Sequence, residues 1–264
     1  MSKSNKEKVL NALANKKLVK VIAGINNYNK QKVLDVVTSA EFGGANSVDI
    51  CDDAEIIKAV RGTIELAIFV SSVNAKKLIE AQQYGADVLE IGNFESLYKE
   101  GKSISKEEIL NIAKEVKLNL KENVLLCCTV PATLDVKDQL ELAGELLNLG
   151  VDILQTEGFA PELPVTERKD QTYTEILRAA STLTNTKEIT KAFPDANVIS
   201  ASGITPTTAP LAISMGASGI GVGNFISSQP YQAYMTDKVK ILVDSLYDFS
   251  SAYLRVKEQL LAYS

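Results

Sequence analysis

The sequence predicts an α/β fold in which short buried strands alternate with helices, and three observations support this. First, eight short runs rich in Val, Ile or Leu punctuate the chain, and each ends near Gly, Ser, Asn or Thr. Second, the segments between these runs place apolar residues at helical spacing. Third, 264 residues are enough for one large domain of this kind. The eight runs lie at 18–25, 46–51, 66–72, 87–93, 124–130, 152–158, 197–203 and 219–226.

Each run is typical of a strand that is buried on both faces, because its residues are almost continuously apolar. The segment 30–44 illustrates the helices that follow such strands. The dipeptide Gly-Ala stands before predicted strands at 44–45, 85–86 and 216–217, and Gly150 with the next valine is a near copy. A helix that ends at Gly and leads into a strand is ordinary chemistry for a helix-to-strand loop.

Strict alternation of strands and helices implies parallel strands that are joined by right-handed crossovers. Eight such units in a chain of this length predict a closed (β/α)8 barrel, the TIM barrel. The alternative is an open, doubly wound sheet. No linker or low-complexity segment divides the chain, so we expect one domain over residues 1–264.

Three segments stand outside this regular pattern. Two long connections, 94–105 and 159–173, follow the fourth and sixth predicted strands. Both belong to the face where barrels of this kind carry their sites, and the second could act as a lid; the alternative for each is a tolerated surface insertion. The tail 229–263 has helical spacing, which predicts that it covers the barrel. It is also rich in Tyr, so a homodimer contact is a second interpretation of part of it.

Composition excludes several function classes. The net charge is −5, so the whole molecule has no basic footprint for nucleic acid or an anionic membrane. No apolar run reaches the roughly 18 residues of a membrane-spanning helix. Residues 1–17 lack the apolar core of a secretory signal and carry Glu7, which also argues against a cleaved transit peptide. Three cysteines indicate reduced thiols in a cytosol-like compartment, and the absence of His excludes any site that needs imidazole.

Small and Gly-rich residues end the seventh and eighth predicted strands, in the segments ASGIT (201–205) and GVGNF (221–225). In a TIM barrel these two loops often form a phosphate site, because Gly lets main-chain N–H groups approach an anion. The alternative is that these glycines only relieve crowding where the barrel closes. The residues that we expect to bind phosphate are Ser202, Gly203, Ile204, Gly221, Gly223 and Asn224.

Alternation along the strands directs several polar side chains into the barrel, where charged groups are costly unless they are paired. Glu157 ends its strand nearest the predicted phosphate loops and is the first candidate for proton transfer; Glu90 and Asp49 are the others. The alternative for Glu90 and Asp49 is a buried ionic network with Lys20 that holds the barrel together. Lys20 could in principle form a Schiff base, but its depth argues against this. Magnesium could bind to Asp49, Asp52, Glu90 and Glu157 through oxygen ligands, although nothing in their spacing demands it.

Several motifs together resemble the plastid and cyanobacterial family called hypothetical chloroplast reading frame twenty-three. They are KVIAGINNYN, EIGNFESLY, TVPATL, QTEG, ASGIT and GIGVGN, and the similarity runs from about Lys17 to Leu246. The resemblance implies a TIM barrel in the stroma of a plastid that encodes it, or in the cytoplasm of a cyanobacterium. The family supplies no established reaction or catalytic residues. Residues 159–171 and the pair Asn224-Phe225 depart from the pattern that the resemblance leads us to expect.

Three functions fit these observations. The first is an enzyme that acts on a small phosphorylated metabolite, an isomerase or lyase that uses Glu157 as acid and base, since such chemistry does not need histidine. The second is a barrel that binds FMN through the same anion loops. The third is a non-catalytic regulatory or assembly protein. The sequence names no substrate, and fold alone is only a prior for function.

Overall fold

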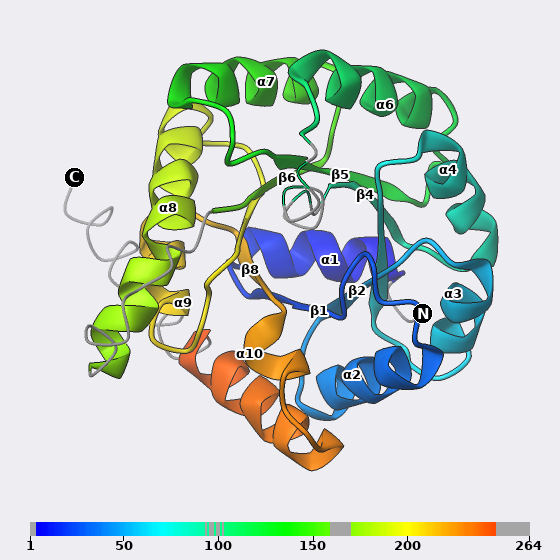
Figure 1. Ribbon diagram of the computed structural model, residues 1–264. Coiled ribbons are helices and arrows are strands. Elements are labelled where there is room, and N and C mark those ends of the chain that lie inside the picture. Colours follow the sequence, from blue (N-terminus) through cyan, green and yellow to red (C-terminus); the bar gives the residue numbers. More distant parts are fainter. Residues whose placement is uncertain are drawn as a thin grey trace, which may run out of the picture.

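Eight parallel strands close into a barrel in which each strand pairs with the next and β8 pairs with β1 (Figure 1). The computed structural model describes residues 4–92, 94, 98, 101, 103–158 and 170–246. Every one of the eight predicted strands is present, and the predicted (β/α)8 barrel is confirmed. The strands are β1 (Leu18–Ile22), β2 (Ser47–Ile50), β3 (Ala67–Ser72), β4 (Val88–Ile91), β5 (Leu125–Val130), β6 (Ile153–Thr156), β7 (Val198–Ala201) and β8 (Gly219–Val222).

Helices surround the barrel and cover the outer faces of its strands (Figure 1). Most of them begin at a Ser, Asn or Asp whose side chain accepts a main-chain N–H of the first turn, which is why the helices start where they do. Asn29 is one of these caps, at the start of α2. The helices are α1 (Asn5–Ala14), α2 (Lys30–Phe42), α3 (Ala54–Arg61), α4 (Ala75–Tyr84), α6 (Lys106–Leu118), α7 (Val136–Asn148), α8 (Gln171–Ala192), α9 (Ala209–Ser214) and α10 (Asn224–Ser227).

The N-terminal helix α1 closes the end of the barrel at which the strands begin. Val9 and Leu13 of α1 pack against a buried lumen cluster that includes Leu18, Phe69 and Leu125. Figure 1 shows α1 lying across the barrel opening. Because this end is sealed by apolar side chains, a ligand has to enter from the other end, where the strands finish.

The starts of β2, β4, β6 and β8 share one hydrogen-bond pattern, which repeats four times around the barrel. The residue before each of these strands donates its main-chain N–H to the preceding strand, and its side chain accepts an N–H from the same residue of that strand. Asp152, for example, is joined to Leu126 by both bonds, each 2.9 Å long. The four residues are Asn46, Asp87, Asp152 and Ser218.

A glycine in the left-handed region stands two residues before each of these four positions. Gly85 has φ +114° and Gly216 has φ +110°. The recurrent Gly-Ala or Gly-Val step therefore ends a helix and turns the chain so that the next residue meets the neighbouring strand. The sequence pattern predicts that a helix ends at each of these glycines. The structure shows in addition that such a glycine precedes every second strand, namely β2, β4, β6 and β8.

The helical segment 232–246 packs on the outside of the barrel, as predicted for the first part of the tail. Val239, Leu242 and Leu246 are buried, and Val239 lies so close to Gly43 that a side chain at Gly43 would collide with it. The rest of the tail and residues 159–169 of the long loop lie outside the described residues. The homodimer contact and the single domain over 1–264 therefore stay predictions.

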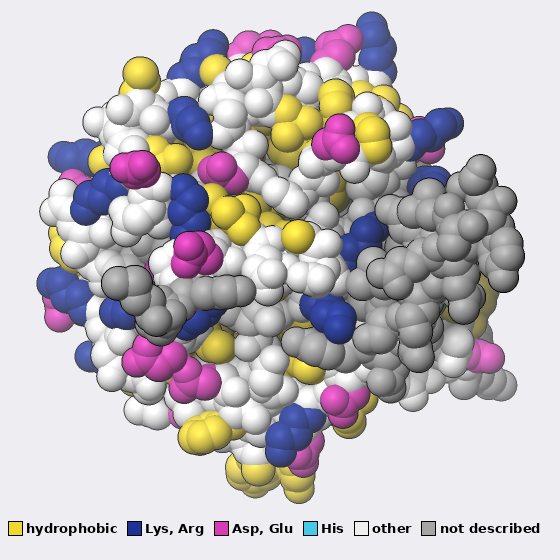
Figure 2. All heavy atoms as spheres, turned by 180° about the vertical axis from the view of Figure 1, so that it is seen from behind, with side chains coloured by type: hydrophobic (Ala, Val, Ile, Leu, Met, Phe, Trp, Pro, Cys, Tyr) yellow, Lys and Arg dark blue, Asp and Glu magenta, His cyan; other side chains and the backbone are white. Residues whose placement is uncertain are grey.

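Within the described residues, no helix combines the length and the apolar character that a bilayer crossing needs. Figure 2 shows Lys and Arg side chains interspersed with Asp and Glu over the face that it draws. Charges of both signs that are mixed in this way create no strong single-sign field on that face.

Candidate functional site

The two Gly-rich strand ends lie side by side, at the end of the barrel where the strands finish. Ala201 of β7 pairs with Gly221 of β8, so the chain continues two residues beyond this pair to Gly203 on one strand and Gly223 on the other. Neighbouring strands are about 4.8 Å apart. The sequence-predicted phosphate residues of the two loops are therefore brought together.

The main chain at the end of β7 is held in an uncommon conformation. Ser202 has φ +74° and Gly203 has φ +72°, so two successive residues are left-handed. A Cβ on Gly203 would lie 2.7 Å from the main-chain oxygen of Arg178 in α8, so no larger residue fits there. A left-handed Ser costs free energy and is often found at a functional position.

Four main-chain N–H groups at these strand ends donate to no acceptor among the described residues. The next N–H along, that of Thr205, donates to the Thr208 hydroxyl over 2.9 Å and is therefore occupied. Gly223 is spacious, since the nearest atoms to a Cβ placed on it belong to Ile22 at 3.6 Å. The four groups belong to Gly203, Ile204, Gly223 and Asn224.

Glu157 follows β6 at the same end of the barrel and is 4% exposed. Its Oε1 accepts a 2.6 Å hydrogen bond from the Tyr98 hydroxyl and a 3.2 Å bond from the main-chain N–H of Ala132. Burial, together with the neighbouring Glu157 carboxylate, raises the pKa of Tyr98 well above its ordinary value of 10.0. Tyr98 therefore keeps its proton at neutral pH and remains a donor.

The chain at the end of β6 and the chain at the end of β7 both pack against helix α8. A Cβ on Gly158 would lie 2.6 Å from the main-chain N of Thr182, and the turn at Gly203 packs in the same way on Arg178. Residues four apart on a helix are about 6 Å from each other, one turn along the surface. The chain beside Glu157 and the chain at Gly203 are therefore held about one helical turn apart on α8.

Below the mouth, the barrel lumen contains an ionic network. Lys20 is 0% exposed; its ammonium donates to a carboxylate oxygen of Glu90 and lies 3.8 Å from a carboxylate oxygen of Asp49. Burial alone would lower the pKa of Lys20, but the two carboxylates outweigh burial and raise it above its ordinary 10.5. The Ser71 hydroxyl donates to Asp49. The predicted network of Lys20, Glu90 and Asp49 is confirmed; a role for the two carboxylates in proton transfer stays a prediction.

Gln155 extends this network across the lumen. Its Nε2 donates to Glu90 Oε1 over 2.7 Å and to the Thr129 hydroxyl over 3.2 Å. These bonds link β4, β5 and β6 at one level of the barrel. Among the described residues, no three His, Cys, Asp or Glu side chains form a group that could hold a metal ion.

Two polar features of this face were not predicted from the sequence. Tyr98 covers Glu157, although the two residues are 59 positions apart in the chain. On the opposite side of the mouth, Asp52 accepts hydrogen bonds from the Lys77 ammonium at 2.9 Å and from the Ser72 hydroxyl at 2.6 Å. The only sequence signal for Tyr98 is its place in a long loop that follows a strand.

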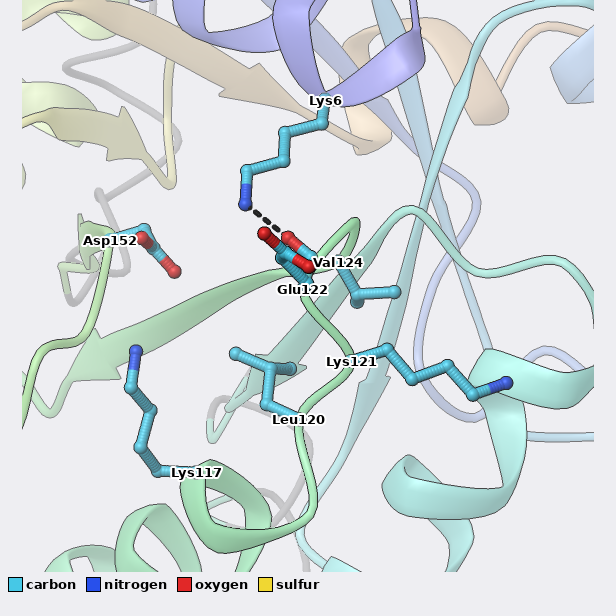
Figure 3. A pocket seen from close by; sticks show the side chains of 7 residues that line it. All are labelled: Lys6, Lys117, Leu120, Lys121, Glu122, Val124 and Asp152. Atoms are coloured by element: carbon cyan, nitrogen blue, oxygen red, sulfur yellow. Dashed lines mark hydrogen bonds between the residues drawn. The ribbon is translucent and has the colours of Figure 1, made fainter.

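A separate pocket lies at the closed end of the barrel, between α1, the end of α6 and the loop before β5 (Figure 3). Its volume is about 230 Å³. Figure 3 shows the Lys6 and Lys117 side chains extending toward it, and both ammonium groups already donate to main-chain oxygens, those of Glu122 and Gly150. The pocket also contains Asp152, which holds the start of β6, so its lining has a structural role.

Comparison with known proteins shows which family this chain belongs to. The family model described as "Protein of unknown function (DUF561)" matches residues 3–251. The chain belongs to this family. A relative of DUF561 from Cyanidium caldarium, named "Uncharacterized protein ycf23", is 37% identical over 225 residues, which are 85% of this chain and 88% of the relative. A protein of the same name from Cyanophora paradoxa is 34% identical over 223 residues, 83% of this chain and 88% of the relative.

Solved structures that resemble this DUF561 protein share its fold at low sequence identity. The (S)-3-O-geranylgeranylglyceryl phosphate synthase from Thermoplasma acidophilum superposes with a TM-score of 0.62 at 16% identity, over 93% of this chain and 99% of that protein. A 3-hexulose-6-phosphate synthase superposes with a TM-score of 0.58 at 14% identity, over 86% of this chain and 99% of that protein. At this low sequence identity, the structural similarity establishes a shared (β/α)8 barrel fold and does not establish a shared function.

Proposed function

We propose that this protein binds a small phosphorylated metabolite at the ends of β7 and β8, and that Glu157 transfers a proton in an isomerase or lyase reaction on it. One observation carries the proposal: four main-chain N–H groups on two neighbouring strand ends have no acceptor among the described residues, and a buried carboxylate directly follows the adjacent strand β6. Main-chain N–H groups that meet in this way bind an anion without a charged side chain.

Glu157 is suited to move a proton because its carboxylate is nearly buried and accepts hydrogen bonds from two donors. Two donors, the Tyr98 hydroxyl and the Ala132 N–H, stabilise its ionised form at one oxygen. When Glu157 accepts a proton from a substrate, Tyr98 can turn its hydroxyl toward the charge that develops on the substrate. The reaction class that needs only these groups is proton transfer at a carbon next to a carbonyl.

The names of similar structures support a phosphorylated ligand. The synthase from Thermoplasma acidophilum is described in complex with sn-glycerol-1-phosphate, and another similar structure, with a TM-score of 0.58, is an orotidine 5'-phosphate decarboxylase. These barrels act on different phosphorylated compounds, so they favour the phosphate group and no particular substrate. The name ycf23 that the relatives carry favours a plastid stroma or a cyanobacterial cytoplasm as the compartment.

Binding is tested by titrating inorganic phosphate into the protein in a calorimeter, with two variants at Gly223. Gly223→Asn and Gly223→Asp add side chains of nearly equal size at a position where a Cβ makes only ordinary van der Waals contacts. We expect the wild-type protein and Gly223→Asn to bind phosphate, and Gly223→Asp to lose at least about tenfold in affinity through charge repulsion. A wild-type protein that binds no phosphate at millimolar concentration, or equal binding by the two variants, would contradict the proposal.

Proton transfer is tested by following deuterium uptake from D2O into dihydroxyacetone phosphate and ribulose 5-phosphate by NMR, since each has an acidic C–H next to a carbonyl. We expect exchange with the wild-type protein and a loss of at least about 100-fold in Glu157→Gln, which keeps the shape but is no base. Tyr98→Phe is the matched change in the partner and should cost less. Exchange that persists in Glu157→Gln would remove Glu157 from the chemistry, and binding without exchange of any probe would favour the non-catalytic alternative.

A further inference from the structure

One stripe of residues along α8 faces the barrel, and Arg178 belongs to it. Residues that are four, seven, eight and eleven positions apart share one face of a helix. The residues at these distances after Arg178 are all buried, and the Asn185 amide among them donates to the main-chain oxygen of Glu157 over 3.0 Å. They are Thr182, Asn185, Thr186 and Ile189. Arg178 therefore faces the same way, toward the barrel.

Arg178 is exposed although the rest of this stripe is buried, because it lies level with the mouth. A Cβ on Gly203, two residues beyond the end of β7, would lie 2.7 Å from the main-chain oxygen of Arg178. In the part of the chain that the structure describes, the Arg178 guanidinium has no hydrogen-bond or ion-pair partner. Glu175, one turn earlier, accepts hydrogen bonds from Gln171 and Thr205 instead.

The direction of a helical side chain brings the Arg178 guanidinium toward the proposed phosphate site. Such side chains point toward the N-terminus of their helix and cover the turn before their own Cα. For Arg178 this turn contains Glu175, which binds the Thr205 hydroxyl at 2.8 Å. Thr205 directly follows Ile204, whose N–H has no acceptor among the described residues. An Arg side chain spans one helical turn, about 5.4 Å, so the guanidinium can reach an anion held at Gly203 and Ile204.

The hydrogen-bond donors that meet at the mouth match a terminal phosphate group in number. The four main-chain N–H groups of the strand ends and a guanidinium fork of two N–H groups supply about six donors. The three terminal oxygens of a phosphate monoester accept about six hydrogen bonds, whereas the two free oxygens of a phosphate diester accept about four. A monoester also carries nearly two negative charges at neutral pH, and a diester carries one. A site that includes the guanidinium therefore suits a monoester better.

We infer that the Arg178 guanidinium binds the phosphate group together with the strand-end N–H groups, and that the complete site selects phosphate monoesters over phosphate diesters. This inference rests on the proposed function and adds to it a charged ligand-binding residue and the class of phosphate ester. Arg suits this role because its planar fork of N–H groups binds two phosphate oxygens at once. Lys at the same position supplies the charge without the paired geometry.

The test measures the binding of methyl phosphate and dimethyl phosphate by calorimetry at about pH 8, where the monoester is a dianion. We expect Arg178→Met to bind methyl phosphate at least about tenfold more weakly than the wild-type protein, and Arg178→Lys to recover part of the loss. Lys187→Met is the matched control: it removes one charge from an exposed residue of α8, about 140° around the helix from Thr182, and should keep the wild-type affinity.

The preference for a monoester gives a second readout of the same experiment. The wild-type protein should bind methyl phosphate at least about tenfold more tightly than dimethyl phosphate, and this ratio should fall at least about threefold in Arg178→Met. Unchanged affinity for methyl phosphate in Arg178→Met, an equal loss in Lys187→Met, or a wild-type ratio near one overturns the inference.

An NMR titration separates failure of this inference from failure of the proposed function. Methyl phosphate is added to 15N-labelled protein, and the side-chain Nε resonance of Arg178, assigned by its absence in Arg178→Lys, is followed with the strand-end N–H resonances. A common saturation curve for both supports the inference. Shifts of the strand-end resonances with Arg178 unmoved leave the phosphate site standing and overturn the inference. Unmoved strand-end resonances overturn the proposed function and the inference with it.

Discussion

Replacing Lys20 with Met tests the ionic network at the centre of the barrel. Lys20, Glu90 and Asp49 are all 0% exposed, and the ammonium is the positive partner that both carboxylates share. Met has a similar length and no charge. The variant therefore leaves two carboxylates buried without their cation, while the packing over Phe69, whose ring centre lies 4.8 Å from the ammonium, stays nearly filled.

We expect a large decrease in the free energy of unfolding, because a buried charge that loses its partner destabilises the folded state much more than an exposed charge does. Removing one partner of a buried ion pair typically costs about 3–5 kcal/mol. Domains are stable by only about 5–15 kcal/mol, so Lys20→Met should lose a third or more of the free energy of unfolding. The double variant Lys20→Met with Glu90→Gln should recover much of this loss, because Asp49 keeps the Ser71 hydroxyl as a donor.

Urea unfolding at pH 7, followed by circular dichroism, measures these free energies for the wild-type protein, the two single variants and the double variant. We expect a coupling free energy between the two sites of at least about 2 kcal/mol. A cost below about 1 kcal/mol for Lys20→Met, or additive effects in the double variant, would show that the network does not hold the barrel together.

Three further predictions concern stability. Ser202→Gly should raise the free energy of unfolding by about 1 kcal/mol, since the left-handed conformation strains Ser but not Gly; no gain in urea unfolding would argue against strain. Asp152→Ala should cost about 1–3 kcal/mol, because the N–H of Leu126 loses its acceptor, whereas Asp152→Asn keeps an acceptor and should cost less. Burial raises the pKa of the Cys127 and Cys128 thiols above the ordinary 9.0, so the native state keeps protons that the unfolded chain releases. Stability from this source is complete below pH 9 and falls as pH rises above it, and the slope between pH 9 and 10.5 should be smaller when both cysteines are replaced with Ala; an unchanged slope would contradict the assignment.

The strands and the inward direction of their polar residues could be predicted because both depend on local patterns. Apolar runs bounded by small residues correspond to the eight observed strands, and the two-residue period places Lys20, Glu90 and Gln155 inside the barrel. The pairing of the last two strands follows from chain order in a closed barrel. The proximity of Gly203 to Gly223 could therefore be predicted without coordinates.

Features that depend on contacts between distant segments, or on unexpected main-chain angles, could not be predicted. Tyr98 reaches Glu157 from another loop, and nothing in its neighbours in sequence specifies that contact. Ser202 adopts a conformation that usually indicates Gly. The fourfold hydrogen-bond pattern is hidden because the residue after the Gly-Ala step varies between Asn, Asp and Ser, which share an acceptor oxygen and little else.

The most direct test of the account follows the main-chain N–H resonances of the 15N-labelled protein as inorganic phosphate is added. We predict that the largest shifts, saturating together, belong to Gly203, Ile204, Gly223 and Asn224. The alternative anion site is the pocket with Lys6 and Lys117 at the closed end of the barrel. Shifts confined to residues around that pocket, with the four strand-end resonances unmoved, would contradict the central claim.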